Sequence, residues 1–471
     1  MNAAIPPRRA NGGRARILIV GGGITGLAAA HRLRERLGDA AEIVIAERAM
    51  RLGGKIHTVD LAGRPIEAGA ESILAARPEA VGLAESVGLG GDLVHPTGLT
   101  PALSLDGRLR DFPTGTMMGI PADPADVAAI ADVKERADSG GPILAPGADM
   151  SVGELVRTHL GSEILDRLVS PMLAGVYAGD VDRLSVAAVM PGLAEALRRH
   201  SSLTEAVAEV KRPPEGRTRA KERVFATIDG GLGRLITATS AASRADVRLG
   251  MTVRELRQTP YGWEVIAGPV PDPMRIEADA VLLAVPASPA ARLLRNVEPE
   301  AAAALSGVAY ASVALASFAF EDIDLPEHSG FLTPAGNGKS VKAATFTSRK
   351  WPHLGRRRTF LRVSMGRLGE EALLQYDDAD LIKTALRELG EHLGQRVPEP
   401  VAQRVDRWGG ALPQYAPGHT ERFRAAREKL RARPGIAIAG AAVDGVGIAA
   451  CIASGQAAAA EIIAQLAPES D

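Results

Sequence analysis

The chain is 471 residues long and 46% of its residues are hydrophobic, which is enough to build a large buried core. Lys and Arg number 55 against 56 Asp and Glu, so the net charge of -1 argues against wholesale binding to nucleic acid. The one cysteine, Cys451, excludes an internal disulfide framework and any multi-cysteine metal or iron–sulfur site. These properties fit a reducing compartment, and we expect a cytoplasmic protein without a metal ion.

Two stretches bear on targeting and membranes. The N-terminal arginines are followed by a short apolar run, Ile17–Val20, so no signal peptide is expected. Ala301–Phe320 has no charge over 20 residues, but its small residues drive insertion weakly and its flanks are acidic. We interpret it as a helix end followed by buried strands. No transmembrane span is expected, and a weak peripheral contact with a membrane stays open.

The first elements of the chain form a predicted βαβ unit. Ile17–Val20 is a short β-rich run, and Ile24–Leu37 carries apolar residues at helical spacing. Ile43–Ala46 is a second short apolar run, typical of a buried strand. This order is typical of a parallel sheet covered by helices.

A glycine motif, Gly21-x-Gly23-x-x-Gly26, lies directly between that strand and helix. Such glycines allow a tight turn, close approach of the backbone to a pyrophosphate, and close packing of helix against strand. The phosphates then lie at the positive N-terminus of the helix, which is formed here by Ile24 and Thr25. Glu47 ends the second strand, where a carboxylate can accept both hydroxyls of an adenosine ribose. The sequence therefore predicts dinucleotide binding.

Further elements follow along the chain. A largely helical stretch runs from about residue 123 to 212 with a Gly/Pro break at 140–147, and the basic segment 211–223 is expected to be a surface loop. A helix is expected at Leu381–Leu393, and a Gly/Ala-rich helix at the end of the chain. The expected strands are Arg248–Leu256, Trp263–Ala267, Ala280–Val285, Val308–Phe320, Lys342–Thr347, Thr359–Met365 and Ile436–Ala439.

The residues after Glu47 distinguish between NAD and FAD. Glu47-Arg48-x-x-Arg51-x-Gly53-Gly54-Lys55-x-x-Thr58 resembles the extended signature of the flavin amine oxidase and protoporphyrinogen oxidase superfamily. The glycine pair lets the chain pass close to the cofactor, and Arg51 can neutralise its diphosphate. The segment Glu67-Ala68-Gly69-Ala70-Glu71, followed by Ser72, fits the part of the family that brings backbone close to the isoalloxazine ring. The resemblance implies FAD.

A second flavin motif is expected near the C-terminus. The segment 438–452, with Gly440, Val446, Gly447 and Ile448, resembles the late flavin motif of the same superfamily. Gly440 would approach the diphosphate and ribityl chain, and the helix beginning near Val446–Ile448 would direct its dipole at the flavin N1/C2 carbonyl. Relatives touch the adenine with backbone atoms at the position of Val253. Cys451 is interpreted as a small buried packing residue.

Internal segments resemble the protoporphyrinogen/coproporphyrinogen oxidase family specifically. They are Pro171–Asp180, the run Asp229-Gly230-Gly231-Leu232, and Trp408 followed by Pro413-Gln414-Tyr415. The segments 346–352 and 361–367 are similar to the Gram-positive, actinobacterial branch. The resemblance implies FAD-dependent oxidation of coproporphyrinogen III to coproporphyrin III in haem biosynthesis, a six-electron reaction that uses O2 and forms three H2O2. Because the flavin performs the chemistry, no catalytic side chain is expected; Trp408 is counted with the cofactor residues.

The substrate residues are less well defined. Relatives that act on protoporphyrinogen commonly have a basic residue, thought to hold a propionate, where this chain has Pro101. Propionate recognition must then come from elsewhere, and each candidate is equally a surface or salt-bridged residue. Gly175, Tyr177 and Met365 are candidates for the cavity lining, whereas Tyr415 and His419 are expected to be structural. The candidate cations are Arg349, Lys350, Arg362 and Arg367.

The predicted fold class is α/β with an α+β insert. A discontinuous Rossmann-like FAD-binding domain is interleaved with a substrate domain of mixed sheet and a helical subdomain. The FAD-binding parts are residues 14–91, 212–288 and 421–471, the mainly helical insert is 92–211, and the substrate-binding domain is 289–420.

Three alternatives stay open. Protoporphyrinogen IX oxidase shares the fold and chemistry, and its substrate has two carboxylates rather than four. The second alternative is a flavin amine oxidase or a carotenoid desaturase. An amine oxidase would offer an aromatic cage beside the flavin, which 3% aromatic residues make harder to build. The chain could also be a non-catalytic flavin-binding partner of other haem-pathway enzymes, with which the enzyme itself could make transient contact.

Overall fold

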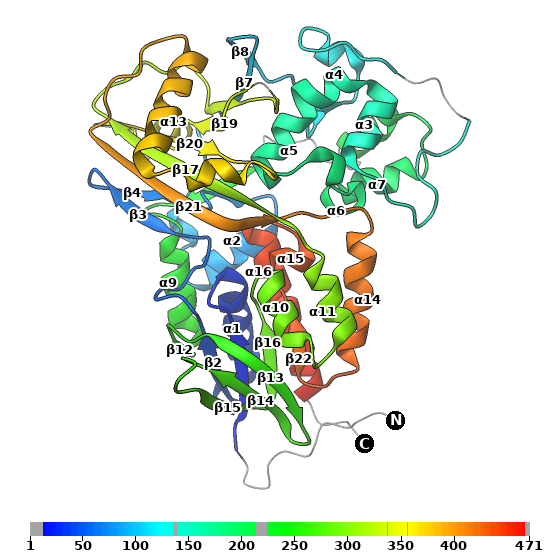
Figure 1. The fold of residues 1–471 in the computed structure, drawn as a ribbon, viewed down its shortest axis with the longest axis vertical. Helices are drawn as coiled ribbons and strands as arrows, with labels where there is room; N and C mark the ends of the chain where they lie inside the picture. The colour runs from blue at the N-terminus through cyan, green and yellow to red at the C-terminus, as the bar shows by residue number, and fades with distance from the viewer. Residues whose placement is uncertain (1–12, 136–139, 213–223, 337, 356, 467–471) are drawn as a thin grey trace.

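The computed structural model describes residues 13–135, 140–212, 224–336, 338–355 and 357–466. A parallel sheet with its helices forms one end of the molecule, and a larger mixed sheet and a helical subdomain lie side by side at the other end (Figure 1). The α/β fold class is thereby confirmed. Most of the predicted surface loop at 211–223 lies outside the described residues.

The five-stranded sheet is parallel and has the order β12-β2-β1-β16-β22. Its strands come from three distant parts of the chain, which explains why the nucleotide-binding fold is discontinuous in sequence. They are β1 (Ala15–Val20), β2 (Ala41–Ala46), β12 (Asp246–Arg248), β16 (Ala280–Leu283) and β22 (Ile436–Ile438).

Alternate residues of β1 enter different hydrophobic cores. Ile17 and Ile19 pack with helices α1 (Ile24–Leu37) and α16 (Ile448–Leu466). Leu18 and Val20 face the antiparallel sheet β13 (Val253–Thr259), β14 (Gly262–Ala267) and β15 (Met274–Ala278), together with α10 (Ala287–Leu294) and α11 (Pro299–Ser306). A strand buried on both faces is expected to be continuously apolar, as this one is.

The seven-stranded sheet has the order β21-β17-β20-β19-β18-β7-β8 and is mixed, because β18 pairs with β7 in parallel and the other pairs are antiparallel. Helix α13 (Asp378–Leu393) covers one face, over a core that includes Phe318, Val363 and Leu389. The strands are β7 (Ala102–Leu105), β8 (Arg108–Asp111), β17 (Tyr310–Phe320), β18 (Gly330–Leu332), β19 (Val341–Thr345), β20 (Thr359–Met365) and β21 (Ala402–Pro413).

The helical subdomain has its own core, built on residues such as Leu155, Leu168 and Leu193. Regular α-helices begin only at Val152, later than the sequence predicted, and Pro124–Val127 is a short 3-10 turn. The glycines and prolines between residues 140 and 147 favour turns, so no regular helix forms directly before Val152. The helices are α3 (Val152–Leu160), α4 (Ser162–Ile164), α5 (Ser170–Tyr177), α6 (Val186–Val189), α7 (Pro191–Leu197) and α8 (Leu203–Lys211), with a π-helical turn at Leu165–Val169.

Smaller elements connect these layers. The short strands are β3 (Thr58–Leu61), β4 (Arg64–Glu67), β5 (Ile73–Leu74), β6 (Leu93–Val94), β9 (Thr116–Met117), β10 (Ile120–Pro121) and β11 (Phe225–Ile228). The remaining helices are α2 (Pro78–Ser86), α9 (Gly233–Ser243), α12 (Thr347–Lys350), α14 (His419–Arg431) and α15 (Ala441–Asp444).

One predicted strand is wrong. The run 248–256 is divided between β12, which joins the parallel sheet, and β13, which joins the antiparallel one. Gly250, with a φ of +67°, lies in the turn between them. The interpretation of 301–320 as a helix end and a buried strand is confirmed by α11 and β17.

Helix α16 is the one helix in the described part of the chain that is long and apolar enough to cross a membrane. Its residues Ile452 and Ile462 are fully buried in the core that also contains α1. One face of α16 is therefore packed within the parallel-sheet end of the molecule.

Candidate active site

The first glycine-rich turn connects β1 to α1. Gly21 has a φ of +110°, and a Cβ at Gly26 would lie 2.0 Å from the Gly21 carbonyl oxygen. Helix α1 has Gly23 at its N-cap, without a capping side chain and without an acidic residue in its first turn. The first-turn N–H groups, including those of Ile24 and Thr25, are therefore suited to an anion.

A second glycine-rich turn lies against the first. The Gly53 N–H donates to the Gly22 carbonyl over 2.9 Å, and Gly23 and Gly53 form a parallel bridge. A Cβ at Gly54 would lie 3.3 Å from the Gly23 Cα. The two motifs that the sequence separates by some thirty residues thus form one continuous backbone surface.

Glu47 directly follows β2 and faces the first turn. Its Oε2 accepts the N–H of Gly22 and its Oε1 the N–H of Ala49, each over 2.7 Å. The carboxylate is therefore fixed in orientation while lone pairs remain for a ribose hydroxyl. Arg48, next in sequence, is exposed.

The structure gives Arg51 and Lys55 different roles. The Arg51 guanidinium donates to the carbonyls of Leu52, Gly54 and Ile56, so it holds the shape of the second turn. The Lys55 ammonium has no ion-pair partner in the described part of the chain. Burial lowers its pKa, partly offset by the nearby Cys451, and its Nζ lies 5.8 Å from the Tyr310 ring centroid. Lys55 is therefore a buried cation whose charge is not neutralised by an ion pair within the described residues, whereas Arg51 is engaged by backbone carbonyls.

The C-terminal motif packs on the first turn. A Cβ at Gly455 would lie 2.2 Å from the Thr25 carbonyl oxygen, and one at Gly440 would lie 3.6 Å from the Thr25 Oγ1. Gly447, with a φ of +103°, precedes α16, which carries no acidic residue in its first turn. The predicted residues Val446, Gly447 and Ile448 thus lie at a second helix N-terminus suited to negative charge.

These features fit FAD. They are two helix N-termini without acidic residues, glycines that leave backbone exposed, and a buried lysine without an ion-pair partner in the described residues. Val253 begins β13, close to Met251, whose N–H donates to the Glu47 carbonyl over 2.8 Å. When bound, FAD would supply the two-electron acceptor. Among the described residues, no group of three or more His, Cys, Asp or Glu is placed to hold a metal ion.

The segment from Glu67 to Glu71 runs between the two sheets. The Ala70 N–H donates to the Lys55 carbonyl over 2.9 Å, and the Trp408 Nε1 donates to the Ala68 carbonyl over 2.7 Å. A Cβ at Gly69 would lie 2.1 Å from the Lys55 carbonyl oxygen. This segment is therefore packed directly on the second glycine-rich turn.

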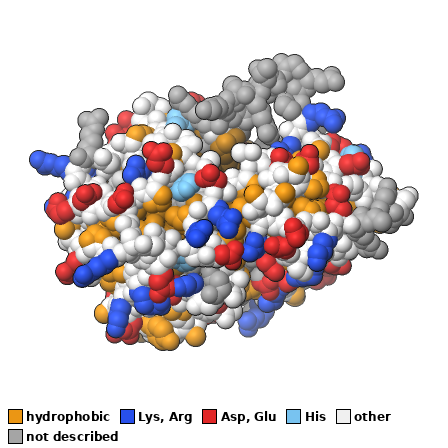
Figure 2. Space-filling model, turned by 90° about the horizontal axis from the view of Figure 1, so that it is seen from above, with side chains coloured by type: hydrophobic (Ala, Val, Ile, Leu, Met, Phe, Trp, Pro, Cys, Tyr) orange, Lys and Arg blue, Asp and Glu red, His pale blue; other side chains and the backbone are white. Residues whose placement is uncertain are grey.

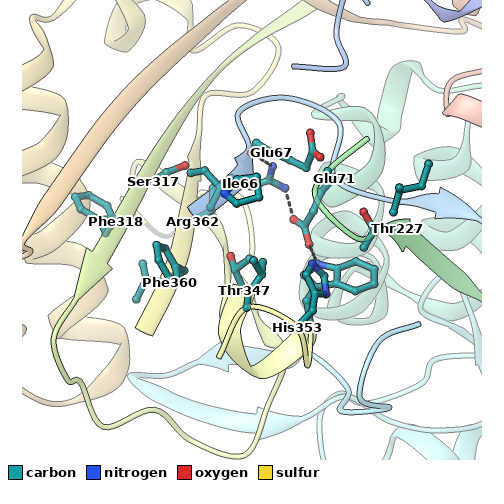
Figure 3. Close-up of a pocket in the computed structure, with 16 residues that line it drawn as sticks. Ile66, Glu67, Glu71, Thr227, Ser317, Phe318, Thr347, His353, Phe360 and Arg362 are labelled. Atoms are coloured by element: carbon teal, nitrogen blue, oxygen red, sulfur yellow. Dashed lines mark hydrogen bonds and ion pairs between the residues drawn. The ribbon is translucent and has the colours of Figure 1, made fainter. Parts of the chain in front are cut away.

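Glu71 is the centre of a nearly buried network of charges (Figure 3). Its carboxylate accepts from Lys350 Nζ at 2.8 Å, Trp351 Nε1 at 2.7 Å and Arg362 Nη2 at 2.5 Å. Burial by itself raises the pKa of Glu71, but the charges of Lys350 and Arg362 outweigh this effect and lower it to about 2. Lys350 and Arg362, two of the candidate propionate cations, are both paired with Glu71, which favours the salt-bridged alternative that the sequence left open. The neighbouring Ser72 is partly buried.

The pKa of Glu67 is shifted in the opposite direction to that of Glu71. Burial raises its pKa to about 7, although its Oε1 accepts from the Leu232 N–H at 2.6 Å and from the Thr58 hydroxyl at 3.0 Å. It lines a cavity of about 30 Å³ together with Ser317 and His353 (Figure 3), enough for roughly one or two water molecules. The Ser317 Oγ and the His353 Nδ1 have no hydrogen-bond partner among the described residues.

The remaining substrate candidates are dispersed. Arg349 donates to the Leu325 carbonyl over 2.8 Å. Arg367 is buried, and its nearest acceptors are Thr333 Oγ1 at 3.2 Å and Glu370 Oε2 at 3.3 Å. Met365 is fully buried in the core under α13, so the prediction that it lines a cavity is wrong: its position in β20 points it at that helix.

Gly175 and Tyr177 lie on α5 rather than in a loop. Gly175 is exposed, and a Cβ there would lie 3.3 Å from Leu332 Cδ2 of the mixed sheet. The Tyr177 ring packs edge-on at 6.0 Å from that of Tyr415, and burial raises its pKa to about 12. Tyr415 in turn donates to the Ala441 carbonyl and stacks on His419, as expected of structural residues.

Two further cations near these elements were not among the candidate residues predicted from the sequence. Arg77, just before α2, is exposed, and its charge acts to lower the pKa of Tyr177. Lys342 is buried in β19, and burial together with Arg367 lowers its pKa to about 7. A lysine within the apolar run 341–344 is a recognisable signal, whereas nothing in the local sequence pairs Arg77 with Tyr177.

The fold and the glycine-rich turns define an FAD-dependent oxidoreductase. A family model described as flavin containing amine oxidoreductase matches residues 24–463, and the chain belongs to this family. It is 35% identical over 458 residues to the coproporphyrinogen III oxidase of Mycobacterium tuberculosis strain H37Rv, covering 95% of this chain and 97% of the relative. The coproporphyrinogen III oxidase of Bacillus subtilis is 30% identical, covering 96% and 99%.

A solved structure has a similar fold. The crystal structure of a "Putative protoporphyrinogen oxidase" from Exiguobacterium sp. 255-15 superposes with a TM-score of 0.82 at 30% identity, covering 95% of this chain and 98% of that one. The predictions of family, of an oxidoreductase and of FAD as cofactor are confirmed.

Proposed function

We propose that the protein oxidises coproporphyrinogen III to coproporphyrin III, using O2 as the acceptor. The observation that carries this proposal is the 35% identity to the Mycobacterium tuberculosis coproporphyrinogen III oxidase over nearly the whole of both chains. Each turnover would remove six hydrogens from the substrate and reduce three O2 to three H2O2. The reaction places the protein in haem biosynthesis, and a cytoplasmic location is proposed with it.

The surroundings of the candidate site support a large, partly apolar, anionic substrate. Hydrophobic side chains extend across the middle of the face formed by the mixed sheet and the helical subdomain, between charged side chains of both signs (Figure 2). Gly175 leaves open space on α5 apart from its contact with Leu332. The exposed Arg77 has no ion pair within the described residues, so it is available to a carboxylate. These groups suit a macrocycle with propionates at its rim.

Protoporphyrinogen IX oxidation is the second candidate, and the name of the Exiguobacterium structure favours it. The test is aerobic turnover of the two porphyrinogens side by side, followed by porphyrin fluorescence and peroxide. We expect a higher kcat/KM for coproporphyrinogen III and three H2O2 per porphyrin formed. Equal or better turnover of protoporphyrinogen IX would contradict the proposal and establish the second candidate.

Reduction of the bound flavin by substrate under anaerobic conditions separates both candidates from a non-catalytic flavoprotein. An oxidase bleaches the flavin absorption on addition of porphyrinogen, and a binding partner leaves it unchanged. A pull-down with other haem-pathway enzymes tests the proposed transient contacts.

A further inference from the structure

Arg362 lies on β20, on the face of the mixed sheet opposite to α13, and reaches towards the parallel-sheet end of the molecule. Its Nη1 donates to the carbonyls of Glu67 and Gly69, at 3.2 and 2.9 Å, and its Nη2 donates to the Glu71 carboxylate at 2.5 Å. One side chain of the mixed sheet thus contacts residues 67, 69 and 71 of a single short segment.

Trp408, on β21 of the same sheet, completes the contact. Its Nε1 donates to the Ala68 carbonyl, which lies between the two carbonyls held by Arg362. Three consecutive carbonyls, of residues 67, 68 and 69, are therefore held by side chains of β20 and β21. The chain bends at residues 68 and 69, directly after β4, and two donors from different strands hold the three carbonyls there.

Glu71 makes this arrangement hard to displace. Arg362 is nearly buried, and so is the carboxylate that it shares with Lys350. Removing one partner of a buried ion pair leaves an uncompensated charge, which is far more costly than losing an exposed pair. The guanidinium is therefore held in one orientation, with both Nη atoms occupied.

The same segment is packed on the second glycine-rich turn through the Lys55 carbonyl. Displacement of its backbone would therefore be transmitted to the turn that fits the cofactor. Because the resemblance to the family places this segment beside the isoalloxazine ring, its position bears on both flavin environment and substrate distance.

We propose that Arg362 is a positioning residue: the mixed sheet fixes the flavin-facing backbone of residues 67–71 through the Arg362 guanidinium and its partner Glu71. In this role Arg362 binds no propionate. The kinetic part of this inference rests on the proposed function, whereas its spectroscopic part requires only bound FAD.

The test compares holoenzymes carrying Arg362→Gln, Arg362→Lys and Trp351→Phe. Trp351→Phe removes a single hydrogen-bond donor to Glu71. It replaces Arg362→Gln in the comparison if that variant does not fold. Arg358→Gln is the matched control, because Arg358 also joins the mixed sheet to a backbone carbonyl, that of Ala62 at 3.1 Å, but from an exposed position away from this segment.

We expect Arg362→Gln to change the visible absorption spectrum and the reduction potential of the bound flavin, measured by dye-linked reduction without substrate. We expect its kcat for coproporphyrinogen III to fall by about tenfold or more, since small misplacements of reacting groups have effects of this size, with KM little changed. Arg362→Lys should recover part of kcat, and Arg358→Gln should resemble the wild type.

The outcomes are distinguishable. A raised KM for coproporphyrinogen III with an unchanged flavin spectrum and kcat would identify a propionate anchor and overturn the inference. A normal spectrum and normal kinetics in Arg362→Gln, or the same spectral change in Arg358→Gln, would also overturn it. A wild-type enzyme that oxidises no porphyrinogen refutes the proposed function instead, and the spectral comparison still decides the role of Arg362.

Discussion

The carboxylate of Glu47 accepts the N–H of Gly22 at 2.7 Å, so the acid that follows β2 is bonded directly to the turn that opens α1. The other oxygen is held by the Ala49 N–H. Glu47 therefore supports the glycine-rich turn in addition to the ribose contact that the sequence motif predicts.

The first prediction concerns Glu47→Ala. This variant should retain FAD less well than wild type, because hydrogen bonds to a carboxylate contribute about 1.5–3 kcal/mol each. The measurement is FAD per chain after dilution and gel filtration, with the exposed Glu205→Ala as control. Wild-type retention in Glu47→Ala would show that the carboxylate has no part in cofactor binding.

The second prediction compares two glycines. Gly69→Ala places a Cβ 2.1 Å from the Lys55 carbonyl oxygen and 3.0 Å from Trp408 Cζ2, so backbone must move. We expect a loss of stability of about 1–3 kcal/mol, as for overpacking elsewhere, together with loss of FAD. Gly82→Ala, within α2 and with nothing within 4 Å of the new Cβ, should instead raise stability by roughly 0.5–1 kcal/mol.

Thermal unfolding of both variants with and without added FAD is the measurement. If Gly69→Ala unfolds at the wild-type Tm and binds FAD normally, this would contradict the close packing of residues 67–71 on the second glycine-rich turn.

The third prediction is a pH dependence. Burial raises the pKa of Glu67 from its usual 4.5 to about 7, so the folded protein binds more protons than the unfolded chain between these values. Stability then falls as the pH rises through this window. Glu67→Gln removes this titrating group. The difference in Tm between Glu67→Gln and wild type should therefore be more favourable to the variant at pH 8 than at pH 5. The change in unfolding free energy behind this shift is at most about 3 kcal/mol.

Glu71 does not interfere with this comparison. Its pKa is lowered from 4.5 to about 2, so its contribution to the stability of the fold is lost only as the pH falls below 4.5. A difference in Tm between Glu67→Gln and wild type that is the same at both pH values would contradict the assigned titration.

The fourth prediction concerns the C-terminal motif. The buried Ser454 hydroxyl accepts the Gly440 N–H at 2.7 Å and donates to Asp444. Ser454→Ala leaves a buried N–H unpaired, which costs about 1–3 kcal/mol, and it frees the loop that follows β22. We expect a lower Tm and weaker FAD retention, while Ser288→Ala, at an exposed position of α10, changes neither. Weaker stability with unchanged FAD binding would confine Ser454 to a structural role.

Local patterns were sufficient for the nucleotide-binding part of the fold. The spacing of apolar residues predicts Ile24–Leu37 as a helix, and the structure has the same bounds. Strand, glycine turn and helix follow one another within the first 50 residues, so backbone preference and periodicity determine them without distant contacts. The same patterns failed at 248–256, where the predicted single strand is divided between two sheets by a turn.

The sequence by itself determined the family, the cofactor and the glycines that a cofactor requires, because these depend on residue type and short spacing. Only the tertiary structure decided what the charged residues do. From the sequence, Arg362 and Lys350 could equally be propionate cations or salt-bridged residues. The structure shows that both are paired with Glu71, which lies 291 and 279 positions earlier in the chain. Which carboxylate an arginine meets depends on how distant segments pack, and burial then makes that pairing decisive, since a buried charge is stable only with its partner.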